Sequence, residues 1–256
     1  MEEDDMAKEF DGKVVIVTGA ASGLGRATAL AFADQGATLA IGDVQEEKLQ
    51  EVAELARAKG VKVTANKLDL IDTAACAKFV EDAAAAHGRL DALVNVAGTI
   101  VMNPIDKVTL ADWDRVYAVN VRAPFFLMQA ALPHLHKTEG GIVNIASNSA
   151  ILGHSYLAPY SSSKAALVQL TKSMAIETIH SKVHINSIAP GGIATPMAGT
   201  MSFPQDIDVS LIARFTGLRG MNQPEDFSDM ILFLASPRGK VAHGSCFVLD
   251  MGTTAG

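Results

Sequence analysis

Short runs of β-branched and other apolar residues alternate along the chain with longer segments in which apolar residues return at helical spacing. Strands are predicted at Lys13–Thr18, Thr38–Ile41, Val61–Ala65, Leu90–Asn95, Ile142–Ala146, Val183–Ile188 and Cys246–Leu249. Helices are predicted at Arg26–Gln35, Glu46–Lys59, Thr73–His87, Leu110–His136, Tyr160–Ile179 and Glu225–Ala235. Gly60 and Gly88 end two of these helices, and Pro124 predicts a kink in the longest one.

This alternation predicts an α/β fold with a parallel sheet. Strands that are apolar on both sides and separated by helices are typical of a sheet covered on each face. Right-handed crossovers then give a doubly wound Rossmann fold, which we expect to be a single domain over residues 1–256 with a flexible tail at residues 1–10. Ligands bind such sheets outside the carboxyl ends of the strands, so the turns after the strands are where function is expected.

Composition and charge exclude several classes of protein. The 256 residues are 49% hydrophobic and 19% charged, which favours a folded chain with a sizeable core. A net charge of −7 argues against a nucleic-acid partner, because a phosphate backbone needs a basic face. The acidic start Met1–Asp5 predicts no signal peptide, and no apolar run predicts a membrane span. Two cysteines and seven scattered histidines predict neither a disulfide framework nor a metal site, so we expect a cytoplasmic protein.

A glycine-rich turn follows the first predicted strand. The segment Thr18–Gly25 places Gly19, Gly23 and Gly25 just before the first helix. Glycines allow close approach of the backbone, and a helix N-terminus offers N–H groups to a pyrophosphate. The spacing is one residue wider than the GxGxxG fingerprint, and a plain tight turn is the alternative. Its place in the first βα unit favours a dinucleotide site.

Asp43 follows the second predicted strand, close to where dinucleotide folds place an acid against the adenosine ribose. Its carboxylate can accept hydrogen bonds from both ribose hydroxyls and would repel a 2′-phosphate. No Lys or Arg stands at Val44 or just before Gly23. The sequence therefore predicts NAD (NADH) rather than NADP as cofactor, and a solvated loop aspartate is the alternative.

Two later turns carry further candidates. Asp69 follows the third strand and can reach the adenine amino group, although an exposed loop acid fits its spacing nearly as well. The fourth strand ends in Asn95-Val96-Ala97-Gly98, whose small residues let a cofactor pass close to the backbone. Asn95 can also pin the neighbouring strand, and a glycine-terminated strand is the alternative.

Tyr160 and Lys164 lie four positions apart at the start of a predicted helix, so they share one face. An ammonium group near a phenol favours the phenolate and lowers its pKa from about 10, which makes tyrosine a usable proton acceptor or donor. Ser147 ends the fifth strand, where its hydroxyl can stabilise a reacting oxygen, and Ser149 is a competing candidate. The alternatives are a tyrosine that caps a core helix, a solvated lysine and a turn-forming serine.

In this order and at this spacing, the signals resemble those of the classical short-chain dehydrogenase/reductase family over nearly the whole chain. The residues that carry the resemblance are the Thr18–Gly25 turn, Asp43, Asn95-Val96-Ala97-Gly98, Asn120, Ser147, Tyr160-Ser161-Ser162-Ser163-Lys164 and Pro190-Gly191-Gly192-Ile193-Ala194-Thr195. The resemblance implies an oxidoreductase that moves a hydride between nicotinamide and an alcohol or ketone carbon. It also implies a seven-stranded sheet and a homotetramer built on helices near Asp112–His136 and Pro159–Ile179.

The resemblance also implies roles for single residues at the chemical end. Tyr160 would be the catalytic acid/base, and Ser147 would orient the substrate oxygen, so both would contact the substrate. Lys164 would also bind the nicotinamide ribose. Asn120 would hold a proton-relay water near Lys164.

Further roles are implied along the cofactor. Ile193 and Thr195 would contact the nicotinamide carboxamide, and Asp69 and Leu70 would flank the adenine. The full set of expected cofactor contacts is Gly19, Ser22, Gly23, Leu24, Gly25, Asp43, Val44, Asp69, Leu70, Asn95, Ala97, Gly98, Tyr160, Lys164, Pro190, Gly191, Ile193 and Thr195. Two departures from the family pattern are Val96, where a second asparagine is frequent, and Met251, where glycine is frequent. Met251 changes the loop shape that the resemblance implies and leaves the implied chemistry unchanged.

In this family the segment 195–220 closes over the substrate as a lid. Here it carries the apolar residues Met197, Met201, Phe203, Ile207, Leu211, Ile212 and Phe215. Methionines and aromatics favour an adaptable apolar pocket, although they can equally pack the lid onto the body. Residues expected to line the same mouth are Ile151, Leu152, His154 and Tyr156. We therefore predict a hydrophobic secondary alcohol or ketone as substrate.

Two rival functions remain. A 3-oxoacyl thioester (acyl-carrier-protein) reductase performs the same chemistry, but it would normally use NADPH and a basic surface for its acidic carrier. Asp43 and the net acidity argue against both. The rival from another class is a non-catalytic NAD-binding oligomer, against which the intact set of Ser147, Tyr160 and Lys164 argues.

Overall fold

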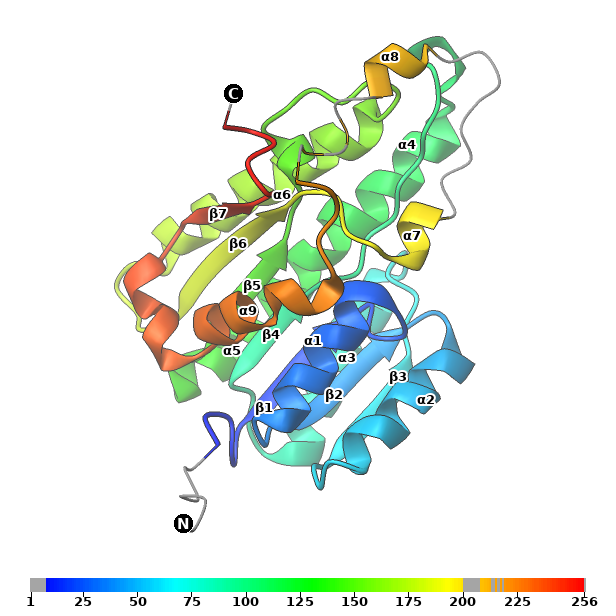
Figure 1. Ribbon diagram of the computed structural model, residues 1–256. Helices are drawn as coiled ribbons and strands as arrows, with labels where there is room; N and C mark the ends of the chain where they lie inside the picture. Colours follow the sequence, from blue (N-terminus) through cyan, green and yellow to red (C-terminus); the bar gives the residue numbers. More distant parts are fainter. Residues whose placement is uncertain (1–7, 200–207, 213–214, 216, 218, 256) are drawn as a thin grey trace.

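A seven-stranded parallel sheet forms the centre of the protein (Figure 1). The computed structural model describes residues 8–199, 208–212, 215, 217 and 219–255. The strand order is β3-β2-β1-β4-β5-β6-β7, and every neighbouring pair is parallel. The strands are β1 (Val14–Thr18), β2 (Thr38–Asp43), β3 (Val63–Lys67), β4 (Ala92–Asn95), β5 (Gly141–Ile145), β6 (His184–Pro190) and β7 (Cys246–Leu249). The predicted doubly wound α/β fold is therefore confirmed.

The central strands are buried along their whole length, including polar positions such as Asn144 and Asn186. Every residue of β1, β5 and β6 is buried. The predicted bounds are off by one or two residues at most strands. For example, β2 continues through Gly42 and Asp43 because its neighbours β1 and β3 still pair with it there.

Helices cover both faces of the sheet. Their bounds are α1 (Gly23–Asp34), α2 (Glu46–Arg57), α3 (Thr73–His87), α4 (Leu110–Tyr117), α5 (Ala123–Thr138), α6 (Ala158–Glu177), α7 (Pro196–Gly199), α8 (Val209–Ile212) and α9 (Ser228–Ala235). Short 3₁₀ turns are η1 (Ile105–Lys107), η3 (Asn148–Ala150), η5 (Pro224–Phe227) and η6 (Pro237–Ala242). Since successive strand side chains point to opposite faces, Val15 and Val17 pack under α1, α2 and α9, whereas Ile16 packs under α3, α5 and α6 (Figure 1).

The long helix predicted at Leu110–His136 is in fact three pieces. A π-helical turn, η2 (Ala118–Arg122), separates α4 from α5, and the Ala123 N–H donates to the Ala118 carbonyl. The predicted kink at Pro124 is therefore misplaced, because the irregular backbone lies just before the proline. Pro124 has no N–H to give to the Asn120 carbonyl in an α-helical bond, which favours a wider turn at that point.

The predicted flexible tail, residues 1–10, extends too far along the chain. Phe10 is fully buried, its backbone N–H donates to the Gln35 carbonyl, and its ring meets Phe32 edge-on at 4.8 Å. Glu9 accepts two hydrogen bonds from Arg238. Residues 8–10 are thus part of the folded body, whereas residues 1–7 lie outside the described residues.

The strand order reverses between β1 and β4, and this switch point positions the site. β1 lies between β2 and β4, so the crossovers leave in opposite directions and the turns at the carboxyl ends diverge. A cavity of about 1100 Å³ opens there, and residues of α7 and α8 also line it. Within the described ranges, no helix is both long and apolar enough to cross a membrane.

Candidate active site

The glycine turn after β1 is packed tightly by backbone atoms. Gly19 has φ of +68° and donates its N–H to the Gly42 carbonyl at 2.8 Å. A Cβ built on Gly25 would lie 2.0 Å from the Gly19 carbonyl oxygen, so no other residue fits without moving the turn. Ser22 occupies the N-cap of α1, but its side chain makes no capping hydrogen bond. The side chain lines the cavity at the N-terminus of a 12-residue helix, as expected of an anion site.

Asp43 stands at the end of β2 with its carboxylate fixed by the backbone. Its Oδ2 accepts a hydrogen bond from the Ala21 N–H at 3.0 Å, and its Oδ1 accepts one from the Gln45 N–H at 2.9 Å. These bonds link the end of β2 to the glycine turn on one side and to α2 on the other. Asp43 and Val44 both line the cavity, so the acid keeps lone pairs for a ligand there.

Asp69 serves its own turn as well as the cavity. Its Oδ1 accepts a hydrogen bond from the Ile71 N–H at 2.9 Å, which is the local turn role that an exposed loop acid would have. Asp69 and Leu70 nevertheless both line the cavity. Both residues therefore lie at the cavity, and their contact with adenine stays a prediction.

The end of β4 is joined to β1 by a threonine. Thr18 Oγ1 accepts hydrogen bonds from the Val96 and Ala97 N–H groups at 3.2 and 3.3 Å. Ala97 and Gly98 line the cavity, but Asn95 does not. Asn95 is 2% exposed and donates through Nδ2 to Asn144 Oδ1 of β5 at 2.8 Å. The prediction that Asn95 pins the neighbouring strand is confirmed, whereas its expected cofactor contact is not what this geometry shows.

Asn120 lies in the π-helical turn η2 and is fully buried behind the cavity wall. Its Oδ1 accepts from the Thr99 N–H, and its Nδ2 donates to the Thr99 carbonyl and to Ser163 Oγ. A Cβ built on Gly98 would lie 3.4 Å from both Asn120 Oδ1 and Lys164 Nζ. Asn120 therefore ties the strand end after β4 to α6 beside Lys164, without lining the cavity itself.

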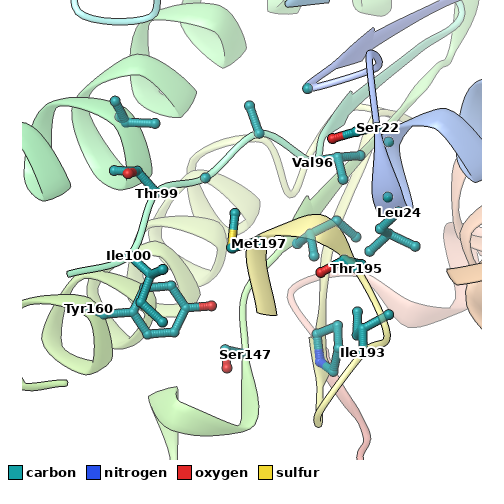
Figure 2. A pocket seen from close by; sticks show the side chains of 18 of the residues that line it. Ser22, Leu24, Val96, Thr99, Ile100, Ser147, Tyr160, Ile193, Thr195 and Met197 are labelled. Carbon is teal, nitrogen blue, oxygen red and sulfur yellow. The ribbon is translucent and has the colours of Figure 1, made fainter. Parts of the chain in front are cut away.

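Tyr160, Lys164 and Ser147 converge on one side of the cavity. Figure 2 shows Tyr160 and Ser147 across the space from Ser22, Leu24 and Val96. Tyr160 and Lys164 come from the first two turns of α6, which begins at Ala158 rather than at the predicted Tyr160. Ser147 is the N-cap of η3, where its Oγ accepts the Ser149 N–H at 3.1 Å.

Burial sets the proton affinities of this group. Desolvation raises the pKa of Tyr160 above its ordinary value, and the hydrogen bond with Ser147 lowers it by less. The predicted lowering by Lys164 is wrong for this structure. Lys164 Nζ lies 5.8 Å from the centroid of the Tyr160 ring and donates to the Ile145 carbonyl at 2.7 Å. Lys164 is 3% exposed, and burial lowers its own pKa to about 8.

The segment after β6 closes the opposite wall. The bend after Pro190 is held by the Ala194 N–H, which donates to the Asn222 carbonyl at 2.9 Å. Thr195 lies over the glycine turn, since a Cβ on Gly23 would meet its side chain at 3.0 Å. Of the residues predicted here, those that line the cavity are Pro190, Gly191, Ile193 and Thr195.

Several lining residues were missed by the sequence interpretation. They include Lys48, Thr99, Ile100 and Arg115. Thr99 and Ile100 directly follow Gly98, so continuing the strand-end segment by two residues would have found them. Lys48 and Arg115 come from exposed helical positions that read as solvated, and only the packing of α2 and α4 beside the strand ends brings them to the cavity.

The substrate end is lined mainly by apolar side chains. Among the residues expected there, those that line the cavity are His154, Met197, Ile212 and Phe215. The described residues Ile151, Leu152, Tyr156 and Leu211 are not among its lining, and Met201, Phe203 and Ile207 lie outside the described residues. Figure 2 shows Met197, which belongs to α7, between Tyr160 and Thr195. The described residues include no group of three or more His, Cys, Asp and Glu that could hold a metal ion.

The parallel sheet and the glycine-lined cavity at its switch point define a nucleotide-binding α/β protein. A sequence model of the short chain dehydrogenase family matches residues 13–205. The chain is 35% identical to a 3-oxoacyl-[acyl-carrier-protein] reductase of Thermotoga maritima, over 95% of this chain and 98% of that protein. It is 36% identical to a meso-2,3-butanediol dehydrogenase of Serratia marcescens, with 96% of each chain covered, and 36% identical to a cyclopentanol dehydrogenase of Comamonas sp., with 95% and 97% covered.

Solved structures agree with this assignment. A short chain dehydrogenase of Burkholderia cenocepacia in complex with NADP superposes with a TM-score of 0.87 at 31% identity, covering 96% of this chain and 99% of that one. A short chain dehydrogenase of Mycobacterium paratuberculosis bound to NAD superposes with a TM-score of 0.89 at 27% identity, covering 97% of this chain and 100% of that one. The chain belongs to the short chain dehydrogenase family, whose members are oxidoreductases that use a nicotinamide cofactor on alcohol or ketone substrates.

Proposed function

We propose that this protein is an NAD-dependent dehydrogenase that interconverts a hydrophobic secondary alcohol and its ketone, with Tyr160 as the acid/base. The observation that carries the proposal is the convergence of Tyr160, Ser147 and Lys164 in the same cavity that reaches Asp43. A nicotinamide dinucleotide spans these two ends of a sheet when it lies across the switch point.

The residues present fit that cofactor. The glycine turn and the N-terminus of α1 suit a pyrophosphate, and Lys164 suits a ribose hydroxyl. Because Gly98 has no side chain, there is room directly beside Lys164 Nζ. When bound, the nicotinamide supplies the hydride acceptor for oxidation and the hydride donor for reduction.

The chain's own groups handle the proton. Because burial raises its pKa, Tyr160 is a protonated phenol at neutral pH, ready to donate to a ketone oxygen during reduction. In oxidation Tyr160 must first release its proton to solvent, and the phenolate then takes the alcohol proton as the carbon–hydrogen bond breaks. Ser147 donates a hydrogen bond to the same substrate oxygen, and Asn120 holds the strand end beside Lys164 as a positioning residue.

Asp43 supports NAD over NADP. The Ala21 and Gln45 N–H groups hold its carboxylate at the cavity edge, so the charge cannot swing away from a ribose 2′-position without losing two hydrogen bonds. A 2′-phosphate would bring like charges together there, which costs several kcal/mol in desolvated sites. Related structures bind NADP in one case and NAD in another, so this preference is a property that we propose for this chain.

The substrate end supports an apolar substrate. Met197, Ile212 and Phe215 line it, and methionine side chains adapt to varied apolar shapes. Two relatives act on small secondary alcohols according to their names, one on a diol and one on cyclopentanol, which has a single hydroxyl. Secondary alcohols with a hydrocarbon body are therefore the proposed class.

The second candidate is reduction of a 3-oxoacyl thioester. The 35% identity to the Thermotoga maritima 3-oxoacyl-[acyl-carrier-protein] reductase favours it. Asp43 argues against NADPH, the cofactor that this reaction would normally use. The net charge of −7 argues against binding of an acidic carrier, which needs a basic partner. Turnover of a 3-oxoacyl thioester with NADPH, at a higher specificity constant than any alcohol with NAD, would favour this candidate.

We further propose a homotetramer in a reducing compartment such as the cytoplasm. Leu110 and Trp113 on α4 and Ile176 on α6 are exposed apolar side chains on the helices expected to carry the interface. Cys76 and Cys246 are free thiols, which suits a reducing environment. Light scattering after size exclusion measures the oligomeric mass, and a monomer would contradict the assembly.

The test of the function is Tyr160→Phe, assayed with NAD across a panel of secondary alcohols. We expect kcat to fall about 10²- to 10⁴-fold, because a general acid/base contributes that much, while NADH binding changes little. Tyr117→Phe is the matched control, since Tyr117 stacks on Trp113 and is not among the residues that line the cavity. Unchanged activity in Tyr160→Phe would contradict the catalytic role, and NADH binding without oxidation of any alcohol in wild type would favour the non-catalytic alternative.

A further inference from the structure

The substrate end of the cavity carries a polar pair that the proposed chemistry does not use. Ser149 Oγ and His154 Nδ1 are 2.7 Å apart, and both residues line the substrate end of the cavity. Ser149 is 6% exposed, and the His154 ring is covered by the Phe215 ring at 4.9 Å between centroids. A serine and a histidine are unexpected among Met197, Ile212 and Phe215.

His154 Nε2 is buried and has no hydrogen-bond partner among the described residues. Leaving a buried polar atom unpaired costs about 1–3 kcal/mol, so such an atom calls for a partner that arrives from outside the chain. His154 is also neutral at neutral pH, because burial lowers its pKa. A neutral partner therefore suits it better than an anion.

The pair offers both a donor and an acceptor, whichever tautomer is present. If Ser149 donates to Nδ1, then Nε2 carries a free N–H and Ser149 Oγ keeps free lone pairs. If Nδ1–H donates to Ser149, then the serine hydroxyl is a free donor and Nε2 is a free acceptor. A hydroxyl group, which is itself both donor and acceptor, complements either arrangement.

The pair adjoins the place of the reacting oxygen. Ser149 and Ser147 share the 3₁₀ turn η3, and the Ser149 N–H donates to Ser147 Oγ at 3.1 Å. Ser147 lies close enough to Tyr160 to lower the pKa of its phenol, and the reacting oxygen is expected beside these two residues. An oxygen held by Ser149 and His154 would thus lie beside the reacting oxygen, as the second oxygen of a vicinal diol does.

We propose that Ser149 and His154 form a subsite for a second, uncharged oxygen of the substrate, so that the preferred substrates are vicinal diols and the matching hydroxyketones. This inference rests on the proposed secondary alcohol dehydrogenase activity and narrows it. The apolar residues hold the hydrocarbon body, Ser147 and Tyr160 hold the reacting oxygen, and Ser149 with His154 hold its neighbour. A purely hydrocarbon alcohol leaves the pair unsatisfied.

The experiment compares matched substrates that differ by one hydroxyl, with NAD as cofactor. The pairs are 2-butanol with 2,3-butanediol, cyclopentanol with cyclopentane-1,2-diol, and 1-phenylethanol with 1-phenyl-1,2-ethanediol. For at least one carbon skeleton, wild type should oxidise the diol with a kcat/KM about ten-fold or more above that of the mono-alcohol, because one unpaired buried group costs that much.

Two variants separate recognition from support of the loop. His154→Phe keeps a ring against Phe215 but removes both nitrogens, and Ser149→Ala removes the hydroxyl. Both should bring the diol-to-mono-alcohol ratio of kcat/KM close to one, mainly through a higher KM of the diol. Ser155→Ala is the matched control, since Ser155 adjoins His154 and is not among the residues that line the cavity.

The outcomes distinguish this inference from the function on which it rests. A wild-type ratio of one or less, with mono-alcohols oxidised, overturns the subsite and leaves the proposed function standing. If both variants lose diol and mono-alcohol activity equally and have a lower Tm, the pair only stabilises the local structure. That result also overturns the subsite. Failure of wild type to oxidise any of the six alcohols overturns the proposed function and the subsite with it.

Discussion

The nucleotide end of the cavity and its substrate end are built in different ways. At the nucleotide end, Gly19 and Gly25 are in backbone contact, and Asp43 is held by two backbone N–H groups. At the substrate end, a side chain holds the start of α8, because the Asp208 N–H donates to the Tyr156 hydroxyl at 2.9 Å. The substrate end also has exposed apolar side chains, and Met197 is 40% exposed.

This difference means that the fold constrains the cofactor site more tightly than it constrains the substrate site. Backbone contacts in a first βα unit cannot vary without shifting β1, β2 and α1 together, so one cofactor site is fixed. Side chains on loops can change without disturbing the sheet, so the substrate can vary on one scaffold. The predictions below test that contrast, from the largest expected effect to the smallest.

Gly25→Ala should have the largest effect. The new Cβ would lie 2.0 Å from the Gly19 carbonyl oxygen, so the whole turn must open. Overpacking of this kind costs about 1–3 kcal/mol or more, and we expect NADH to bind about ten- to hundred-fold more weakly by fluorescence titration. Gly153→Ala is the control at the substrate end, where an added Cβ meets nothing within 4 Å. Equal NADH affinity in the two variants would contradict the proposed difference between the nucleotide end and the substrate end.

Asp43→Asn should relax cofactor choice. Removing the charge removes the repulsion of a 2′-phosphate and leaves Lys48 as a nearby cation at the cavity. We expect the ratio of kcat/KM with NADPH to that with NADH to rise about ten- to hundred-fold, in line with the loss of one like-charge contact. Glu47→Gln is the control, because this exposed acid in the first turn of α2 is not among the lining residues. The same rise in both variants would point to net charge rather than to Asp43.

NADH affinity should depend on pH through Lys164. Its pKa in the free protein is lowered to about 8 by burial, so the ammonium is present below that pH and is lost above it. If binding uses the ammonium form, the Kd of NADH is lowest below pH 8 and rises above it, by at most about ten-fold per pH unit. Lys164→Met should bind more weakly and lose this slope between pH 7 and 9.5. A wild-type Kd that stays flat over that range would contradict the assignment.

Tyr156→Phe should have the smallest effect. It keeps the ring but removes the hydroxyl that accepts the Asp208 N–H at the start of α8. One such bond is worth about 0.5–1.5 kcal/mol, so we expect the KM of the alcohol to rise about three- to ten-fold while the Kd of NADH is unchanged. The reverse pattern, with weaker NADH binding and an unchanged KM, would show that the two ends are not independent.

Local sequence determined the fold class and most of the nucleotide end. Apolar strands alternating with helices have few ways to bury their faces, and the doubly wound sheet is the one observed. The glycine turn and Asp43 were predictable because each adjoins a strand end, and parallel strand ends meet at one edge. Tyr160 and Lys164 were predictable as a pair because helical spacing alone puts them on one face.

Tertiary structure decided what depends on distant partners. Asn95 bonds Asn144 in β5, which strand order alone brings beside it. The direction of the Tyr160 pKa depends on burial and on where the Lys164 ammonium points, and neither can be derived from a spacing of four. Lys48, Arg115 and the pairing of Ser149 with His154 likewise appear only when elements pack together. Periodicity fixes which face a residue takes along its own helix or strand, whereas solvation and hydrogen bonding are set by atoms that lie far away in the chain.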